Sequence, residues 1–363
     1  MSFRPFPSIE QFRHCVADVR HRATYIGKNA AGEALYDETL PQPTLVFEGT
    51  VKLHGTNAGV RFERAAAGWA VAAQSRTRDL TPDDDNSGFA TWVATNEVLA
   101  PLLLALVERS GVMEWEAAHT VTLFGEWVGQ GVNGKTAIGK LSKRLVLFGM
   151  AVDAGTEEER DVVWPDLMEV RAKVTAAKGL GVSDYAQAGV YFINDFQTWA
   201  IPVDFENPEA ALEQLETLTL EVEAECPVAK AMGSEGIGEG IVWTHNSPEF
   251  GHLRFKTKGL KHKGTKSKRV ADIAPEVLAG RKAFVDAVLT ESRLEQGLDY
   301  LVEQGKSISR DHLGLYLEWM GKDVLKEESD TMRASGLEKK DVMKAVNLAA
   351  KDWFLANVSA LAS

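Results

Sequence analysis

Cysteine is scarce in this sequence, and long apolar runs do not occur in it. Cys15 and Cys226 are the two cysteines among 363 residues, and they form neither a CxxC pair nor a cluster with histidine. This argues against a disulfide framework and against a zinc site, and it fits a reducing cytoplasm. No stretch reaches the roughly 18 apolar residues that a membrane helix needs. The stretch from Met1 to Pro7 lacks the apolar core of a secretory signal. We therefore expect a cytoplasmic protein without a membrane partner.

Basic residues are fewer than acidic ones. The chain carries 40 Lys and Arg residues against 52 Asp and Glu residues, a net charge of −12. This balance argues against binding nucleic acid over a broadly basic surface, so any such contact must be local. Internal repeats and low-complexity segments are also absent.

The sequence does contain a large apolar fraction, 45% of its residues, which is ample for a packed core. Its length predicts one large domain or two medium ones. Runs of β-type residues predict strands at 44–52, 57–63, 68–75, 120–128, 144–152, 189–196, 240–245 and 252–258. Apolar periodicity and capping residues predict helices at 8–20, 89–109, 165–178 and 207–223. Residues 27–43 are expected to form a loop.

The character of the sequence changes after Lys268 and Arg269. Beyond them, clusters of β-branched residues are few, and apolar residues recur at helical spacing, as at Val342 and Val346. We therefore predict an α+β protein, with a first domain over residues 1–269 and an α-helical domain over residues 270–363.

A lysine followed by a tight turn stands out near residue 50. Lys52 ends a β-type run, and His54-Gly-Thr-Asn57 leads from it into the next run. Lysine is a weak nucleophile at its ordinary pKa of about 10.4. It attacks well when burial or neighbouring positive charge lowers that pKa. Taken alone, a lysine in a hairpin is usually a solvated edge charge, but further segments favour a chemical role.

These further segments place polar, charged or aromatic residues at strand ends and on strand faces. The residues in question are Arg76, Glu126, Phe148, Glu239, Lys256 and Lys258. Lys256 and Lys258 alternate along a β-type run, so they point to the same side of a strand. Each has an ordinary interpretation: Phe148 as core, Glu126 as a strand-end charge, the two lysines as a solvated face. Their occurrence together and in this order favours a shared site.

In these motifs the chain resembles the covalent nucleotidyltransferases, which are the polynucleotide ligases and capping enzymes. It is most similar to the RNA ligase 2-like branch, which includes the RNA-editing ligases. Residues 52–57 match the branch's first motif, Lys-x-His-Gly-Thr-Asn, at every fixed position. Later motifs are matched by Phe-Gly-Glu at 124–126, Glu-Gly-x-Val at 239–242 and Lys-x-Lys at 256–258. The resemblance covers roughly residues 45–260, and the helical tail resembles the branch in position and class alone.

The resemblance implies a nucleotidyltransferase domain built on ATP-grasp-like antiparallel sheets, followed by the helical domain. It implies an ATP-dependent RNA ligase that joins a 5′-phosphate to a 3′-hydroxyl. Lys52 would become AMP-lysine, AMP would move to the RNA 5′-phosphate, and the 3′-hydroxyl would displace AMP. The cofactors would be ATP and Mg²⁺, with Mn²⁺ as an alternative metal. The motifs leave open which RNA is joined and the oligomeric state.

The resemblance also assigns roles residue by residue. The catalytic lysines would be Lys52, Lys256 and Lys258. The nucleotide-binding residues would be Val51, His54, Gly55, Asn57, Arg76, Glu126, Phe148 and Glu239. Phe148 would stack on adenine, Glu126 would hold the ribose, and Glu239 would position hydrated Mg²⁺. Arg76 would contact phosphate or ribose, and Asn57 would orient the nucleic-acid end. We expect Lys256, Lys258 and Mg²⁺ to lower the pKa of Lys52.

Other interpretations compete with this one. Gly129 to Thr136 matches the P-loop pattern GxxxxGK[ST], although the eight residues from Ala137 to Arg144 are few for a crossover to a parallel strand. A DNA ligase or a capping enzyme usually has Asp where this chain has His54. An RNA-binding protein with an inactive transferase fold is the alternative of another class. Finally, the run from Lys256 to Arg269 holds seven Lys and Arg residues and no acid, which indicates a phosphate-tracking segment or a solvated loop.

Overall fold

The structure, a computed structural model, describes residues 3–65, 68–108, 118–154, 161–259, 261–262 and 280–361. The chain divides into two compact units, Met1–Gly259 and Leu260–Ser363, and each is described by itself. The first unit combines antiparallel sheets with helices, and the second is helical, which confirms the predicted α+β class. The domain boundary predicted near residue 270 falls outside the described residues, as does the basic run from residue 263 to Arg269.

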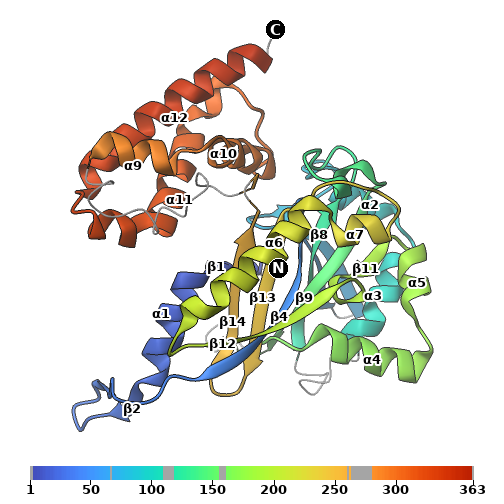
Figure 1. Cartoon of the computed structure of the whole chain (residues 1–363). Coiled ribbons are helices and arrows are strands. Elements are labelled where there is room, and N and C mark those ends of the chain that lie inside the picture. The colour runs from blue at the N-terminus through green and yellow to red at the C-terminus, as the bar shows by residue number, and fades with distance from the viewer. Residues whose placement is uncertain are drawn as a thin grey trace. The chain divides into compact units, whose positions relative to one another are not determined.

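Two large sheets form the first unit (Figure 1). The sheet that carries Lys52, called here the Lys52 sheet, has the strand order β1-β14-β13-β4-β12. Its strands are β1 (Glu10–Gln11), β14 (Gly251–Lys258), β13 (Gly240–Ser247), β4 (Thr44–Lys52) and β12 (Thr198–Asp204).

The sheet that carries Glu126, called here the Glu126 sheet, has the order β10-β9-β8-β5-β6-β7, and β11 pairs with β9 as well. Its strands are β10 (Asp161–Val163), β9 (Arg144–Ala154), β8 (Ala118–Val128), β5 (Thr56–Ala65), β6 (Gly68–Ser75), β7 (Asp79–Leu80) and β11 (Val190–Phe192). A separate hairpin pairs β2 (Tyr25–Lys28) with β3 (Ala34–Tyr36), within the stretch expected to be a loop.

In the Lys52 sheet, the strands β4, β12 and β14 bury alternate residues on the side of the helices. In β4, Phe47 and Val51 are buried, whereas Lys52 lies on the opposite face. The buried face packs against α1 (Phe12–Ala23) and α6 (Leu212–Ala224), which lie along β13 and β14 in Figure 1. The two-residue period of a strand thus places the lysine on the face that the helices leave uncovered.

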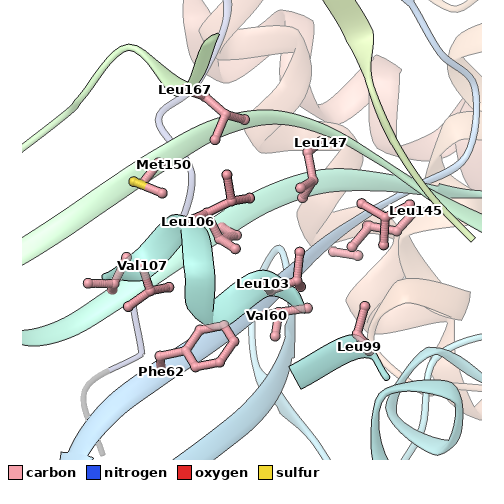
Figure 2. Close-up of a cluster of buried hydrophobic side chains, with 14 of the residues drawn as sticks. Val60, Phe62, Leu99, Leu103, Leu106, Val107, Leu145, Leu147, Met150 and Leu167 are labelled. Carbon is pink, nitrogen blue, oxygen red and sulfur yellow. The ribbon is translucent and has the colours of Figure 1, made fainter. Parts of the chain in front are cut away.

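The Glu126 sheet has its own core on the side away from its polar residues. Four helices cover that side: α2 (Phe89–Thr95), α3 (Leu99–Val107), α4 (Leu167–Lys178) and α5 (Val182–Gln187). Figure 2 shows side chains of β5, α3 and β9 meeting there, including Val60, Phe62, Leu103, Leu106, Leu145, Leu147 and Met150. Short elements complete the unit: α7 (Pro227–Ala231) and the 3₁₀ turns η2 (Ala137–Lys140), η3 (Ile193–Asp195) and η4 (Pro208–Ala211).

The second unit packs helices around one apolar core. Its elements are α9 (Arg281–Val288), α10 (Glu291–Glu303), the turn η6 (Arg310–His312), α11 (Leu313–Ala334) and α12 (Lys339–Leu361). Tyr316, Met320 and Phe354 are fully buried at its centre. The helical character predicted for this region is therefore confirmed.

Two predicted helices differ from the structure, the first at its start and the second in its middle. The helix expected from residue 8 begins at Phe12, because Glu10 and Gln11 form a strand that pairs with β14. The helix expected over 89–109 is two helices, α2 and α3, which are bent by 92° at a short break. Within the described parts of the chain, no single helix is long and apolar enough to cross a membrane, and this bent pair meets the requirement by length and composition only when joined.

Candidate active site

The strand register of the Lys52 sheet brings two lysines to one carboxylate. Gly240 of β13 lies opposite Lys52 of β4 on one side and opposite Lys258 of β14 on the other. A side chain cannot be accommodated at Gly240, because its Cβ would lie 2.1 Å from the carbonyl oxygen of Thr257. Glu239, the residue before it, places its carboxylate between the two ammonium groups. Lys52 Nζ lies 2.7 Å from Oε2, and Lys258 Nζ lies 2.9 Å from Oε1.

Glu239 is the most deeply buried group of this cluster, with its side chain 2% exposed. Burial alone would raise its pKa, but the charges of Lys258 and Lys52 and a hydrogen bond with His54 outweigh burial. They hold the pKa of Glu239 well below its usual range, so the carboxylate is ionised at neutral pH. Nδ1 of His54 lies 3.5 Å from Oε2 of Glu239. The motif histidine therefore lies beside the same carboxylate oxygen as Lys52.

The pKa of Lys52 is raised by its protein neighbours, which is the opposite of the sequence expectation. Burial lowers this pKa, but the charges of Glu239 and Glu126 and the hydrogen bond to Glu239 raise it by more. Arg76 acts in the lowering direction, although its side chain is exposed. Among the protein groups alone, Lys52 is thus a protonated amine that cannot attack. Lys256 and Lys258 therefore do not lower this pKa on their own, and the expected lowering by Mg²⁺ stays a prediction.

The motif turn joins the two sheets, which a simple hairpin would not do. Strand β4 ends at Lys52 in one sheet, and β5 begins at Thr56 in the other. The backbone N–H of Gly55 donates to Oε1 of Glu126 over 3.0 Å. Only glycine fits there, since a Cβ on Gly55 would lie 2.3 Å from the carbonyl oxygen of Trp127. Asn57 pairs with Glu126 across the sheet, and its buried Oδ1 has no hydrogen-bond partner among the described residues.

Phe148 lies at an irregularity in the Glu126 sheet. On β8, Phe124 pairs with Gly149 and Gly125 pairs with Leu147, so Phe148 is an extra residue in β9. Such a bulge changes the direction of the side chains that follow it. Leu147 lies on the core side, and Phe148 remains half-buried on the opposite face. The bulge therefore presents an aromatic ring on the same face as Glu126.

An N-terminal segment that the sequence analysis did not single out completes this face. The ring of Phe6 contacts three aromatic rings, with centroid distances of 4.9 Å to Phe148, 5.2 Å to Phe124 and 5.7 Å to Trp164. The guanidinium of Arg254 lies 5.2 Å from the centroid of the Phe6 ring. Arg254, Lys256 and Lys258 occupy alternate positions of β14, so their side chains share one face of the strand. This spacing is visible in the sequence and could have identified Arg254.

The same N-terminal segment is anchored on the Glu126 sheet. The side chain of Gln74 donates to the carbonyl oxygen of Arg4 over 2.6 Å, and Nε of Arg4 lies 2.8 Å from Oδ2 of Asp153. A few residues later, Glu10 and Gln11 pair with β14 in the Lys52 sheet. The segment thus connects the polar faces of the two sheets beside Phe148.

Comparison with known families identifies the chain. The RNA ligase family profile matches residues 46–258, which is more than half of the chain and includes Lys52, Glu126, Phe148, Glu239 and Lys258. The chain belongs to the RNA ligase family. No curated protein matches it.

Among solved structures this RNA ligase family member is similar to those of a Naegleria gruberi RNA ligase. A lysine-to-methionine mutant of that ligase with AMP and Mn matches with 14% identity and a TM-score of 0.38, and a lysine-to-alanine mutant with ATP and Mn matches with 14% identity and a TM-score of 0.40. Each match covers 71% of this chain and 57% of the Naegleria chain. The present chain therefore spans little more than half the length of that ligase.

The structure brings most of the predicted site residues of this family member together. Lys52, His54, Glu239 and Lys258 form one charged cluster, which Gly55 and Glu126 approach from the other sheet. Lys256 lies two residues before Lys258 on the same strand face. The side chain of Val51 points the other way, into the core beneath α1 and α6, so only its backbone faces the site.

The P-loop interpretation of Gly129 to Thr136 is wrong. The strands on either side of it, β8 and β9, are antiparallel neighbours, whereas a P-loop leads through a helix to a parallel strand. Between them lies the single 3₁₀ turn η2. The segment is a connection within one sheet.

Proposed function

We propose that this protein is an ATP-dependent RNA ligase that joins a 5′-phosphate to a 3′-hydroxyl through a lysyl-AMP and an RNA-adenylate. The observation that carries the proposal is the contact of Lys52 with the buried carboxylate of Glu239, within a chain of the RNA ligase family. A lysine held at a strand end, beside a second lysine and facing Glu126, has the surroundings that attack on a nucleotide phosphate requires.

In the first step Lys52 Nζ attacks the α-phosphorus of ATP, a nitrogen–phosphorus bond forms, and pyrophosphate leaves with the bonding electron pair. The amine must first lose the proton that Glu239 and Glu126 stabilise. Lys256 and Lys258, which lie on β14, offset the negative charge of the phosphates. Lys258 also balances part of the negative charge of the Glu239 carboxylate. Phe148 stacks on the base, and Glu126 accepts hydrogen bonds from the ribose.

The ionised carboxylate of Glu239 suits a divalent cation. The described parts of the chain contain no cluster of three or more His, Cys, Asp or Glu side chains arranged to hold a metal. Mg²⁺ is nevertheless often held by one or two carboxylates together with water and substrate phosphates. Mg²⁺ or Mn²⁺ bound by Glu239 and ATP would supply positive charge at the phosphates. It would also reduce the extent to which Glu239 raises the pKa of Lys52.

In the later steps the RNA 5′-phosphate attacks the AMP phosphorus, and the bond to Lys52 breaks. Lys52 then takes up a proton again, in a site that stabilises the charged amine. The 3′-hydroxyl attacks the RNA-adenylate, and AMP leaves. Asn57 orients the RNA end from the start of β5, where its buried Oδ1 has no partner within the part of the chain that the structure describes.

The test is incubation with α-labelled ATP and Mg²⁺, followed by denaturing electrophoresis. We expect label on the protein from ATP, and none from labelled GTP or NAD. Label from GTP would instead indicate a capping-type enzyme. Absence of label from all three, with the protein folded, would refute the proposal and favour an inactive RNA-binding protein. Sealing of a nicked DNA duplex in preference to RNA would indicate a DNA ligase.

A further inference from the structure

The segment from Gly129 to Arg144, whose resemblance to a P-loop the fold excludes, has no part in the chemistry proposed above. It contains the cations Lys135, Lys140, Lys143 and Arg144 and no acidic residue, in a chain whose net charge is −12. A local excess of this kind is what binding to a polyanion requires, because the attraction is set by nearby charges more than by the total.

One lysine of this segment lies beside the candidate active site. Nζ of Lys140 donates to the carbonyl oxygen of Glu235 over 2.9 Å, four residues before Glu239. Three residues further along, Nζ of Lys143 donates to the carbonyl oxygen of Ser87 over 2.7 Å, and Nε1 of Trp127 donates to the same oxygen over 3.1 Å. The indole of Trp127 belongs to the core on the side of the Glu126 sheet away from Glu126, so this second contact lies on that side. The segment therefore reaches from the loop that leads into Glu239 to the helix-covered side of the Glu126 sheet.

The ammonium groups of Lys140 and Lys143 retain the capacity to bind an anion. Both side chains are exposed. An ammonium has three N–H donors, and the hydrogen bonds just described use one on each lysine, in both cases with a backbone carbonyl. Of the nearby acids, Asp84 pairs with Arg78 and Asp85 accepts hydrogen bonds at the start of α2, whereas the exposed Glu235 lies beside Lys140.

Buried side chains and a backbone hydrogen bond fix the conformation of the segment. Ala137 and Ile138 are each 1% exposed and belong to the core of the Lys52 sheet. The N–H of Ala137 donates to the carbonyl of Ile237 over 2.9 Å, which ties η2 to the loop before Glu239. A Cβ on Gly139 would lie 1.9 Å from the carbonyl oxygen of Asn133, so the turn closes tightly on itself. Cations held on such a frame lose less entropy on binding than cations on a flexible loop.

We propose that Lys135, Lys140 and Lys143 form a surface that binds the backbone phosphates of RNA next to the end that receives AMP. This proposal rests on the proposed function, because that function supplies the RNA. It is separate from the basic run of Lys256 to Arg269, which begins within β14, whereas the present surface belongs to the connection between β8 and β9.

The test measures the affinity of the full chain for a 5′-phosphorylated RNA at several salt concentrations. The variant carries Lys135→Gln, Lys140→Gln and Lys143→Gln. A matched control carries Lys28→Gln, Lys173→Gln and Lys178→Gln, three exposed lysines elsewhere on the first unit that give the same change in charge. Each phosphate contact contributes about 0.7 to the log–log salt slope for single strands and 0.9 for duplex. We therefore expect the slope to fall by about two to three units in the variant and to stay near the wild-type value in the control.

Protein labelling by ATP separates this proposal from the proposed function. If the variant and the control bind RNA alike, the surface is a solvated loop and the inference is wrong, even when both proteins are labelled normally. If the wild-type chain is not labelled, the proposed function fails, and RNA affinity still decides the surface. Should the triple variant lose thermal stability, Lys135→Gln alone decides, with an expected slope change of about 0.7 to 0.9.

Discussion

Each of the two units holds a cluster of charged side chains away from water, but the sign of the central charge is opposite. In the first unit the carboxylate of Glu239 is 2% exposed and lies between Lys52 and Lys258, whose side chains are 22% and 19% exposed. In the helical unit the guanidinium of Arg293 is 4% exposed and lies between Asp323 and Glu328.

The two clusters differ in the sign and the exposure of the outer charges. Arg293 also donates to the carbonyl of Val288 over 2.8 Å, and two carboxylates face its one positive charge. In the other cluster two lysines face the carboxylate of Glu239, and they remain partly open to solvent. Partly exposed lysines can accept a phosphate, whereas a buried arginine that links two carboxylates and a backbone carbonyl holds helices in place. We therefore propose a chemical role for the first cluster and a structural role for the second.

The largest expected effect comes from the nucleophile. Lys52→Arg should abolish protein labelling by ATP, because the guanidinium stays protonated and cannot attack. Lys52→Ala should still seal RNA that already carries a 5′-adenylate, since only the first step needs the amine. A labelled Lys52→Arg protein, or failure of Lys52→Ala on several pre-adenylated RNA ends while folded, would contradict the assignment.

The structural cluster should respond in stability and not in chemistry. Arg293→Met leaves Asp323 and Glu328 without their cation, and loss of one partner of a buried pair costs about 3–5 kcal/mol. We expect denaturant unfolding of the helical unit to shift by that amount while ATP labelling is retained. The control is Lys322→Met, which removes an exposed ion pair with Glu318 and should leave the unfolding curve nearly unchanged. Loss of labelling in a folded Arg293→Met protein would contradict a purely structural role for the Arg293 cluster.

The raised pKa of Lys52 predicts how labelling depends on pH. Since the amine must lose one proton, the rate of labelling should rise with pH, by up to about tenfold per unit, until the pKa of Lys52 in the ATP complex is passed. Sealing of pre-adenylated RNA does not use Lys52 as a nucleophile and should lack this rise. Single-turnover rates from pH 6 to 9 measure both, and a flat labelling profile would show that Lys52 is already neutral.

The aromatic face should show a smaller effect. Phe6→Ala removes three ring contacts, each worth about 0.5–1.5 kcal/mol, and should raise the KM for ATP about tenfold with little change in the maximal labelling rate. Phe6→Tyr, which keeps the ring, is the matched control. In a Phe148→Ala background, Phe6→Ala should add little, because the ring that it positions is already gone. Additive losses would instead indicate that Phe6 acts only on overall stability.

The smallest effect is expected from removing the helical unit. A fragment ending after Arg269 keeps every motif of the candidate site, so it should still be labelled by ATP at close to the rate of the full chain. We expect it to lose part of its RNA affinity, because we propose that the helical unit helps to hold RNA together with the Lys256–Arg269 run, which the fragment keeps. Replacing Lys261, Lys263, Lys266 and Lys268 with Ala should flatten the salt slope by roughly two to four units. An unchanged slope would leave that run as a solvated loop.

Local sequence determined the elements that carry the lysines. The alternation in β4 and β14 follows from a two-residue period, and the match of residues 52–57 to a family motif requires no knowledge of the fold. The same holds for the change to helical spacing after residue 270. These features depend on neighbouring residues in the chain, so a sequence displays them directly.

Only the tertiary structure decided which charges meet. The pairing of Gly240 with both Lys52 and Lys258 brings Glu239 to Lys52 across 187 residues, and that contact raises the pKa that the sequence was expected to lower. Glu10 and Gln11 likewise pair with β14 at the edge of the Lys52 sheet, so the first helix begins only at Phe12. The same segment places the ring of Phe6 against Phe148. Strand order and register are properties of distant segments, and a pKa depends on the balance of burial and charge that they create.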